Sequence, residues 1–313
     1  MRLRTLICTL LLTAVVMPAS AQSKAQRRPL QKKQLTFKAP TKYERRVLRY
    51  DVATGRTVYY DPMPRVQLLD AKSGRYAFKW LGYDGREKTV LFQRADAIDA
   101  VVSAAVRRLK TGQYLYTYNV TNLQSSGTNL GGLAVQSFAA DLRPVSFDNI
   151  HFGHMSKNEE MKYGNWIRFA LLPDFKPAVT PGRSVEFSLE SAAPPGLVEC
   201  RIHGGELGLK GAGEDMPQEL ENILPGYKDW PSGYTIGPNE NLGALSTDEL
   251  VHDIRLWLPQ FRKLGWMSAD AAAWYTRNLR PHSLAVVFQR ADQDLTAGLI
   301  TTETYAVIQT LRR

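Results

Sequence analysis

The chain has 313 residues, a formal net charge of +10 and two cysteines, Cys8 and Cys200. This length gives room for one large domain or two ordinary domains. No stretch after residue 21 is apolar over the roughly 20 residues that a transmembrane helix needs, so the sequence excludes a later membrane span.

Residues 1–21 have the parts of a cleavable secretory signal. A basic start precedes an apolar run, residues 6–17, which is too short to span a bilayer, and small residues follow up to Ala21. We therefore expect cleavage between Ala21 and Gln22 and export to the bacterial periplasm or the extracellular space, with an uncleaved anchor as the alternative. Cleavage removes Cys8, and a chain with one thiol has no internal disulfide, so its fold must rest on apolar burial.

Residues 22–45 are strongly basic, and Glu44 is the only acid among them. Because like charges repel and few apolar side chains are present, we interpret this segment as a disordered arm. Such an arm can lie on an anionic envelope polymer or lipid. The alternative is a solvated leader that only spaces the domain, and we expect no specific binding to nucleic acid.

Residues 46–203 predict an antiparallel β-sandwich domain, because short runs of β-branched and aromatic residues alternate with turns. The clearest strand, residues 114–121, has Tyr114, Tyr116 and Tyr118 on one face. Three rings in a row make Tyr114, Tyr116 and Tyr118 a candidate platform on which sugars or bases stack. Because tyrosines are common in sheets and usually pack across neighbouring strands, packing is the interpretation that the pattern favours.

The later part of this segment predicts further strands at residues 133–138, 145–152, 166–171, 185–189 and 197–202. In the last of them Val198, Cys200 and Ile202 share one apolar face, and the charged residues Glu199 and Arg201 lie on the other face. We expect Cys200 to be buried, with a raised pKa and low reactivity. Residues 96–109 fit both a helical stripe and an alternating strand, so their structure stays open.

Three motifs in this domain resemble a known pattern. Residues 112–122 read G-x-Y-x-Y-x-Y-x-V-x-N, residues 181–188 read P-G-x-S-x-x-F-S, and residues 194–196 read P-P-G. The pattern resembles uncharacterised bacterial exported β-sandwich domains. The resemblance covers about residues 112–202 and implies a fold, but it carries no activity and no catalytic positions.

Residues 204–245 are rich in Gly and Pro and predict a linker, with one helical turn near residues 219–224. Residues 246–313 then predict a helical module that starts at a capping box, Ser246 to Glu249.

The helical module repeats itself, because residues 265–270 (GWMSAD) recur as residues 298–303 (GLITTE). In each copy Gly takes the left-handed position after one helix, and Ser268 or Thr301 caps the next. Two such units predict three or four short helices. The pattern is similar to small C-terminal modules of other exported bacterial proteins, and such a module is a candidate surface for a protein partner. The sequence as a whole thus predicts a mainly β protein, an antiparallel, immunoglobulin-like β-sandwich followed by a small α-helical bundle.

Chemistry-bearing residues are few. His151 and His154, with Asp148 and Glu159, are the only cluster of metal-ligand types. Residues three apart face opposite sides of a strand, so both histidines can bind one metal only in a loop or turn. No nucleophile motif such as G-x-S-x-G occurs. We therefore expect an exported, non-catalytic binding or assembly protein without a cofactor, and the alternative is a metal-dependent hydrolase at this cluster.

Overall fold

The computed structural model describes residues 47–51, 55–60, 65–81, 86–145, 150–155, 165–171, 178–205 and 230–312. The predicted cleavage site at Ala21 and Gln22, the basic arm of residues 22–45 and the helical turn near residues 219–224 lie outside the described residues. Among the residues that are described, no helix is long and apolar enough to cross a membrane.

The first part of the described chain consists of strands, and all pairs between named strands are antiparallel. In chain order they are β1 (Val47–Asp51), β2 (Arg56–Tyr60), β3 (Arg65–Asp70), β4 (Arg75–Leu81), β5 (Glu87–Gln93), β6 (Ala100–Arg108), β7 (Tyr114–Asn122), β8 (Leu130–Ser137), β9 (Arg143–Pro144), β10 (Ile150–Met155), β11 (Asn165–Leu171), β12 (Ser184–Ser191), β13 (Pro195–Gly204) and β14 (Ser232–Pro238).

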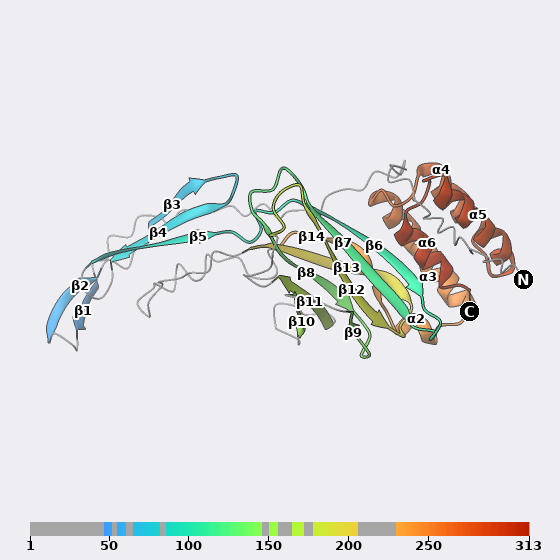
Figure 1. Cartoon of the computed structure of the whole chain (residues 1–313), viewed down its shortest axis with the longest axis horizontal. Coiled ribbons are helices and arrows are strands. Elements are labelled where there is room, and N and C mark those ends of the chain that lie inside the picture. The colour runs from blue at the N-terminus through green and yellow to red at the C-terminus, as the bar shows by residue number, and fades with distance from the viewer. Residues whose placement is uncertain are drawn as a thin grey trace, which may run out of the picture.

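Two sheets form the sandwich, one with the order β10-β11-β8-β13-β14 and the other with the order β6-β7-β12-β9 (Figure 1). Neighbouring strands are often far apart in the sequence, since β7 pairs with β12 and β8 pairs with β13. This is the arrangement of an immunoglobulin-like fold. The predicted fold class is therefore confirmed, although the two packed sheets begin at β6 rather than at residue 46.

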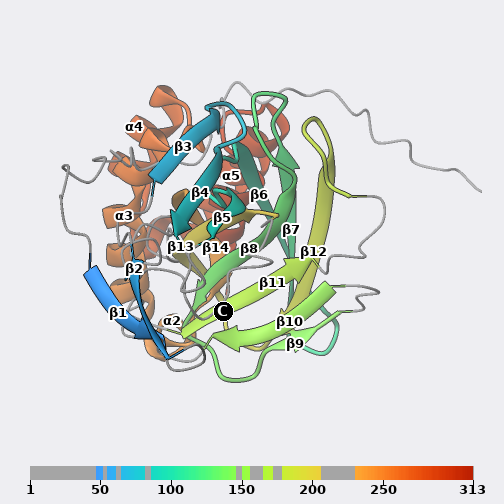
Figure 2. The same cartoon turned by 90° about the vertical axis from the view of Figure 1, so that its left-hand side faces the viewer.

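The strands before β6 form sheets of their own. β1 and β2 pair as a hairpin, and β3, β4 and β5 form a three-stranded sheet. Tyr76, Phe78 and Trp80 on β4 pack with Val90 and Phe92 of β5 in a separate hydrophobic cluster. Figure 1 shows β1–β5 extending away from the sandwich, at the end opposite the helices, and Figure 2 looks along the molecule with these strands toward the viewer.

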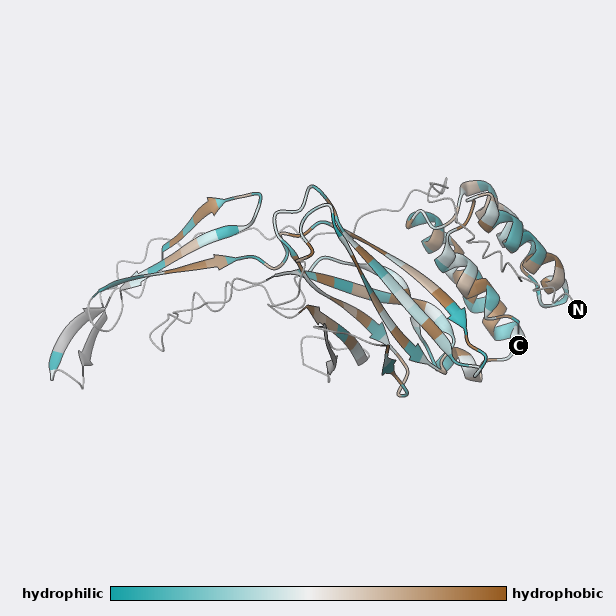
Figure 3. Cartoon of the chain, in the orientation of Figure 1, coloured by the Kyte–Doolittle hydropathy of each residue, from teal (hydrophilic) through white to brown (hydrophobic). Residues whose placement is uncertain are grey.

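Buried and less buried residues alternate along β6, β7 and β12, as expected for a sheet with one covered face. Nearly every residue of β8 is buried, because a second cluster that includes Ala134, Trp166 and Trp230 covers part of the outer face of the five-stranded sheet. Figure 3 shows a matching alternation of hydropathy along the sandwich strands, as brown and teal bands.

The segment that sequence analysis left open follows the same rule. Ala100, Val102 and Ala104 are buried at every second position of β6. β6 pairs along its whole length with β7 through a turn at Gly112, whose φ is 87°, so the strand interpretation is confirmed.

The predicted linker of residues 204–245 needs a correction, because Ser232–Pro238 form β14 and pair with β13. Gly237 is one of the glycines of this Gly- and Pro-rich segment, but in the structure it reflects close packing. A Cβ at this position would lie 2.7 Å from Val198 Cγ2 and 3.0 Å from the carbonyl oxygen of Gln136. Glycine is therefore needed here within a strand.

The remaining elements are helical: α2 (Asn241–Ala244), α3 (Thr247–Lys263), α4 (Ala269–Asn278), the short 3₁₀ helix η2 (Pro281–Ser283), α5 (Leu284–Thr296) and α6 (Thr302–Gln309). The predicted capping box is present at the start of α3. The Ser246 hydroxyl accepts a hydrogen bond from the Glu249 backbone at 3.3 Å, and the Glu249 carboxylate accepts one from the Ser246 backbone at 2.7 Å.

The predicted repeat is also present, as two helix–loop–helix units, α3–α4 and α5–α6. Gly265 and Gly298 have φ values of 74° and 66°, which are the expected left-handed positions. The two loops pair with each other. The Ser268 backbone N–H donates to the carbonyl of Leu299 at 2.8 Å, and the Thr301 N–H donates to the carbonyl of Trp266 at 2.9 Å, which ties the two units together.

The two loops differ in their caps. The Ser268 hydroxyl accepts from the Ala271 backbone at 3.2 Å, whereas Thr301 makes no capping bond and its buried hydroxyl has no partner in the described structure. We therefore expect Ser268→Ala to lower the free energy of unfolding by about 1 kcal/mol and Thr301→Ala to cost clearly less. Urea denaturation of both variants measures this, and equal costs would contradict it.

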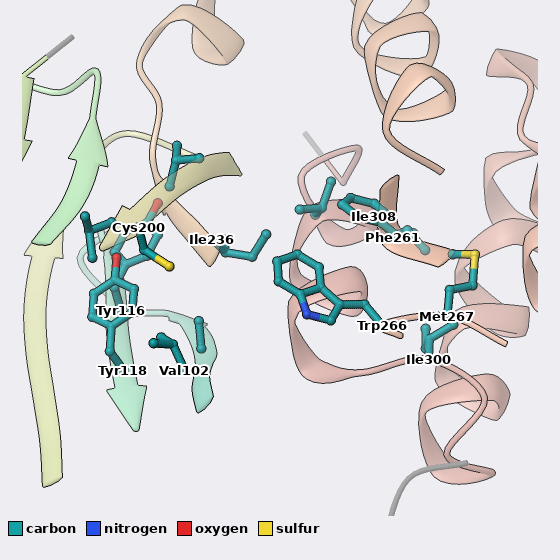
Figure 4. Close-up of a cluster of buried hydrophobic side chains, with 14 of the residues drawn as sticks. Val102, Tyr116, Tyr118, Cys200, Ile236, Phe261, Trp266, Met267, Ile300 and Ile308 are labelled. Carbon is teal, nitrogen blue, oxygen red and sulfur yellow. The ribbon is translucent and has the colours of Figure 1, made fainter. Parts of the chain in front are cut away.

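The helical region and the sandwich share one hydrophobic core. Buried residues of α3 and its following loop, such as Phe261 and Trp266, belong to the same cluster as Val102 of β6 and Ile236 of β14. Figure 4 shows side chains from the strands and from the helical region facing each other, with Trp266 turned toward Ile236. The core is thus continuous across the Gly- and Pro-rich segment that was expected to separate two units.

Helix α6 also bonds directly to the edge of the sandwich. Glu303 has no solvent-exposed surface, and its Oε1 accepts a hydrogen bond from the Ala104 backbone N–H at 2.7 Å. The Thr302 hydroxyl donates to the carbonyl oxygen of Ala104 at 2.9 Å. Because β6 is the edge strand of its sheet, these bonds satisfy backbone groups that would otherwise lack strand partners.

Candidate functional site

The tyrosines of β7 do not form the predicted platform. Tyr116 and Tyr118 are fully buried, and only Tyr114 is partly exposed. The Tyr116 hydroxyl donates to the carbonyl of Ala193 at 2.6 Å, and the Tyr118 ring lies 6.0 Å from that of Phe169. This face of β7 is turned into the sandwich, where burial raises the pKa of both hydroxyls. The platform prediction is corrected, because two of the three rings have no open face.

Cys200 lies inside the sandwich, as predicted. Its side chain is fully buried, and burial raises the pKa of the thiol far above its usual value. Figure 4 places it beside the tyrosines of β7, in the space between the two sheets. A buried thiol with a raised pKa is a poor nucleophile, so Cys200 acts as a small apolar core residue.

The histidine cluster is only partly described. His151 and His154 belong to β10, opposite Ala170 and Ile167 of β11, whereas Asp148 and Glu159 lie outside the described residues. Positions three apart on a strand alternate between its two faces, so β10 is not the loop or turn that a shared metal ligand pair requires. The four-residue site stays a prediction. In the described ranges, no group of three or more His, Cys, Asp and Glu residues is arranged to hold a metal ion.

A third histidine, His203 of β13, is buried on the other face of the five-stranded sheet. Its ring lies 4.2 Å from that of Trp230, and burial lowers its pKa to about 4. The Arg168 guanidinium, 3.4 Å from Nε2, can only donate, so Nδ1 carries the proton and donates to the Gly204 carbonyl at 2.9 Å. A neutral imidazole with both nitrogens engaged is a structural group, not a proton carrier at neutral pH.

The helical region has an open groove between α3 and α4, with a volume of about 670 Å³. Its apolar lining comes from Leu258 and Pro259 of α3 and from Ala269, Ala272 and Ala273 of α4. The alanines and the lining residue Thr276 follow the i, i+3, i+4, i+7 spacing of one helix face. Short side chains along this face leave the space that forms the groove.

The charged residues that line the groove are basic. Arg262 and Lys263 line it at the end of α3, and Arg277 lines it in the last turn of α4. No acidic residue of the described segments lines it. All three basic side chains are exposed, and none forms an ion pair within the described structure. Leu256, one helical turn before Pro259, has 63% of its surface exposed and extends the apolar surface beyond the rim.

No pattern in the sequence predicted this groove. Alanine is the strongest helix former, so the α4 sequence is that of an ordinary helix. The hollow exists only because α4 packs beside α3, which no local pattern specifies. The one sequence feature that relates to the groove is a row of small residues at helical spacing on one face of α4, three alanines and a threonine, followed by an arginine.

Comparisons with known proteins indicate no activity. No protein-family model matches the chain, and no curated protein sequence matches it. Among solved structures, the chain is similar to an uncharacterised protein from Nocardia farcinica, whose crystal structure reveals an immunoglobulin-like fold. The two are 13% identical, the match covers 42% of this chain and 95% of that chain, and the TM-score is 0.26. The similarity identifies no functional residue of this chain.

Proposed function

We propose that the protein is an exported, non-catalytic binding or assembly protein of the bacterial envelope or extracellular space. The observation that carries this proposal is the open groove between α3 and α4, which has an apolar floor and three basic side chains that form no ion pair within the described structure. Grooves of this kind between helices are a common means of recognising a partner segment.

The packing of α3 and α4 against the core is consistent with a binding role. The opposite faces of α3 and α4 carry Leu250, Ile254 and Tyr275, which are buried in the core shared with the sandwich. Helices that are fixed by packing keep the groove in one shape before a partner binds. Less of the binding free energy is therefore lost in ordering the site. The sandwich is then the base on which the helices are held.

Export and surface contact belong to the same proposal. They rest on the signal-like residues 1–21 and on the basic residues 22–45. A basic arm that approaches anionic polymer or lipid would raise the local concentration of the protein at the envelope, where a partner for the groove is to be found.

Photo-cross-linking in intact cells tests the binding role. A benzoylphenylalanine at Leu256, beside the groove, should give adducts with another envelope component. The same residue at Val286 of α5 is a matched control, because that side chain is also apolar and is 58% exposed but lies outside the groove lining. A yield at position 256 that is no greater than at position 286 would overturn the proposed function.

A further inference from the structure

We propose that the groove between α3 and α4 binds an amphipathic helix of a partner protein, apolar on one face and acidic beside it. This inference rests on the proposed binding function and names the chemistry of the partner at the same site.

The shape of the groove fits a third helix. Two helices packed side by side leave a groove along their contact. On α4 this groove is lined by short side chains, which leave it open: Ala269, Ala272, Ala273 and Thr276. These positions span seven residue steps, which is about 10 Å along a helix or two turns. A helix in this seat would place apolar side chains at i, i+3 and i+4 against Leu258 and the alanines, as ridges pack into grooves.

The charges select an acidic helix. Arg262 and Lys263 lie where α3 ends and α4 begins, while Arg277 lies at the other end of α4, so cations stand at both ends of the apolar floor. Among the described residues, Arg277 Nε donates to the carbonyl of Ala273 on its own helix, at 3.3 Å. A partner with carboxylates flanking its apolar face would pair with these groups. A basic partner would be repelled by them.

A second apolar contact lies just outside the groove. Leu256 is on the same side of α3 as Pro259 and Lys263, at spacings of three and seven residues. An exposed leucine in line with the groove gives a helical partner an anchor that a free anion would not use. The occupant is therefore a peptide segment with extended apolar surface, rather than a small anion.

Fluorescence anisotropy with a defined probe tests the inference. The probe is a hydrocarbon-stapled 18-residue helix, with Leu and Ala on one face and Glu elsewhere, and the matched control peptide has Lys at every Glu position. The whole protein should bind the acidic helix about tenfold or more tightly than the basic helix, and the preference should shrink as salt is raised.

Variants then locate the binding. The change Arg262→Glu with Lys263→Glu and Arg277→Glu should weaken binding of the acidic helix about tenfold or more. Lys110→Glu with Arg183→Glu, at exposed positions in loops of the sandwich, is the charge control and should change it less than about twofold. Ala273→Trp leaves the charge unchanged and fills the groove, so it should also abolish binding. Unchanged melting temperatures will show that these exposed substitutions leave the fold intact.

Each outcome has one meaning. Equal binding of the two peptides, or binding that Ala273→Trp does not weaken, overturns the inference. Binding of phosphatidylglycerol vesicles that depends on Ala273 and Arg277 in place of the peptide assigns the groove to lipid and also overturns it. If the peptide fails but Leu256 still cross-links in cells, the proposed function stands without this partner. If both fail, the proposed function is overturned as well.

Discussion

Ending the chain after residue 245 is expected to abolish the native fold of the sandwich, and not only to remove the helical signal. Ile236 of β14 is fully buried, and Val102 of β6 is 93% buried, in a core that includes Phe261 and Ile308 of the helices. Each large apolar side chain that becomes exposed to solvent lowers the free energy of unfolding by about 1.5–3 kcal/mol. A few such losses equal the whole stability of a typical domain, about 5–15 kcal/mol.

The same truncation removes the partners of the β6 edge. Without α6, the Ala104 N–H loses the Glu303 carboxylate and the Ala104 carbonyl loses the Thr302 hydroxyl. A strand edge with open donors and acceptors beside newly exposed apolar residues is prone to pair with other chains. We therefore expect the shortened protein to aggregate as well as to lose stability.

Thermal unfolding followed by circular dichroism measures the effect, with size-exclusion chromatography as a check on aggregation. The sequence predicted the opposite result, since a Gly- and Pro-rich linker before residue 246 implies that the sandwich folds alone. A shortened chain that is monomeric and melts cooperatively within a few degrees of the whole protein would support that division into separate domains.

The contact between α6 and the β6 edge could not be predicted from the sequence. Glu303 has no exposed surface, and its carboxylate reaches the backbone of another element. The contact therefore joins residues that are distant in the sequence, which explains why no local pattern predicted it. What the sequence did indicate at this position was only the start of a helix, after Gly298.

Local features were predictable because they depend on neighbouring residues. The left-handed glycines, the capping box and the inward Cys200 follow from spacings of one to four residues, and all are present. The alternation along β7 likewise identified a strand. The same alternation did not say whether Tyr116 and Tyr118 face solvent or core, because that depends on the sheet packed opposite.

Features that arise from packing between distant elements were not predictable. β14 was missed because Gly237, which is required by a close approach to Val198, looks like a linker residue. The Thr301 hydroxyl was expected to cap a helix, but the loop pairing with Trp266 fixes its backbone instead. The groove was missed for the same reason, since its floor and rim come from two helices that only the tertiary fold brings together.

Gly132→Ala is expected to destabilise the protein by about 3 kcal/mol or more, because the added methyl group has no room. Its Cβ would lie 2.4 Å from the carbonyl oxygen of Phe169 and 2.7 Å from Nε2 of His203. Phe169 is held in the centre of the sandwich, and His203 is fixed by Trp230 and Arg168. Neither neighbour can retreat without disturbing the pairing of β8 with β11 or β13.

Urea denaturation of the Gly132→Ala variant measures this loss of stability, and Gly205→Ala is the matched control because it adds the same methyl group at another glycine. The nearest atom to a Cβ at residue 205 is the Asn129 carbonyl oxygen at 3.9 Å, so that control should cost less than about 1 kcal/mol. Adding His203→Ala to Gly132→Ala should not restore stability, because the backbone oxygen of Phe169 remains in the way. Full rescue by the second change would show that the histidine ring is the obstacle, and that the strands themselves can separate far enough to admit a methyl group.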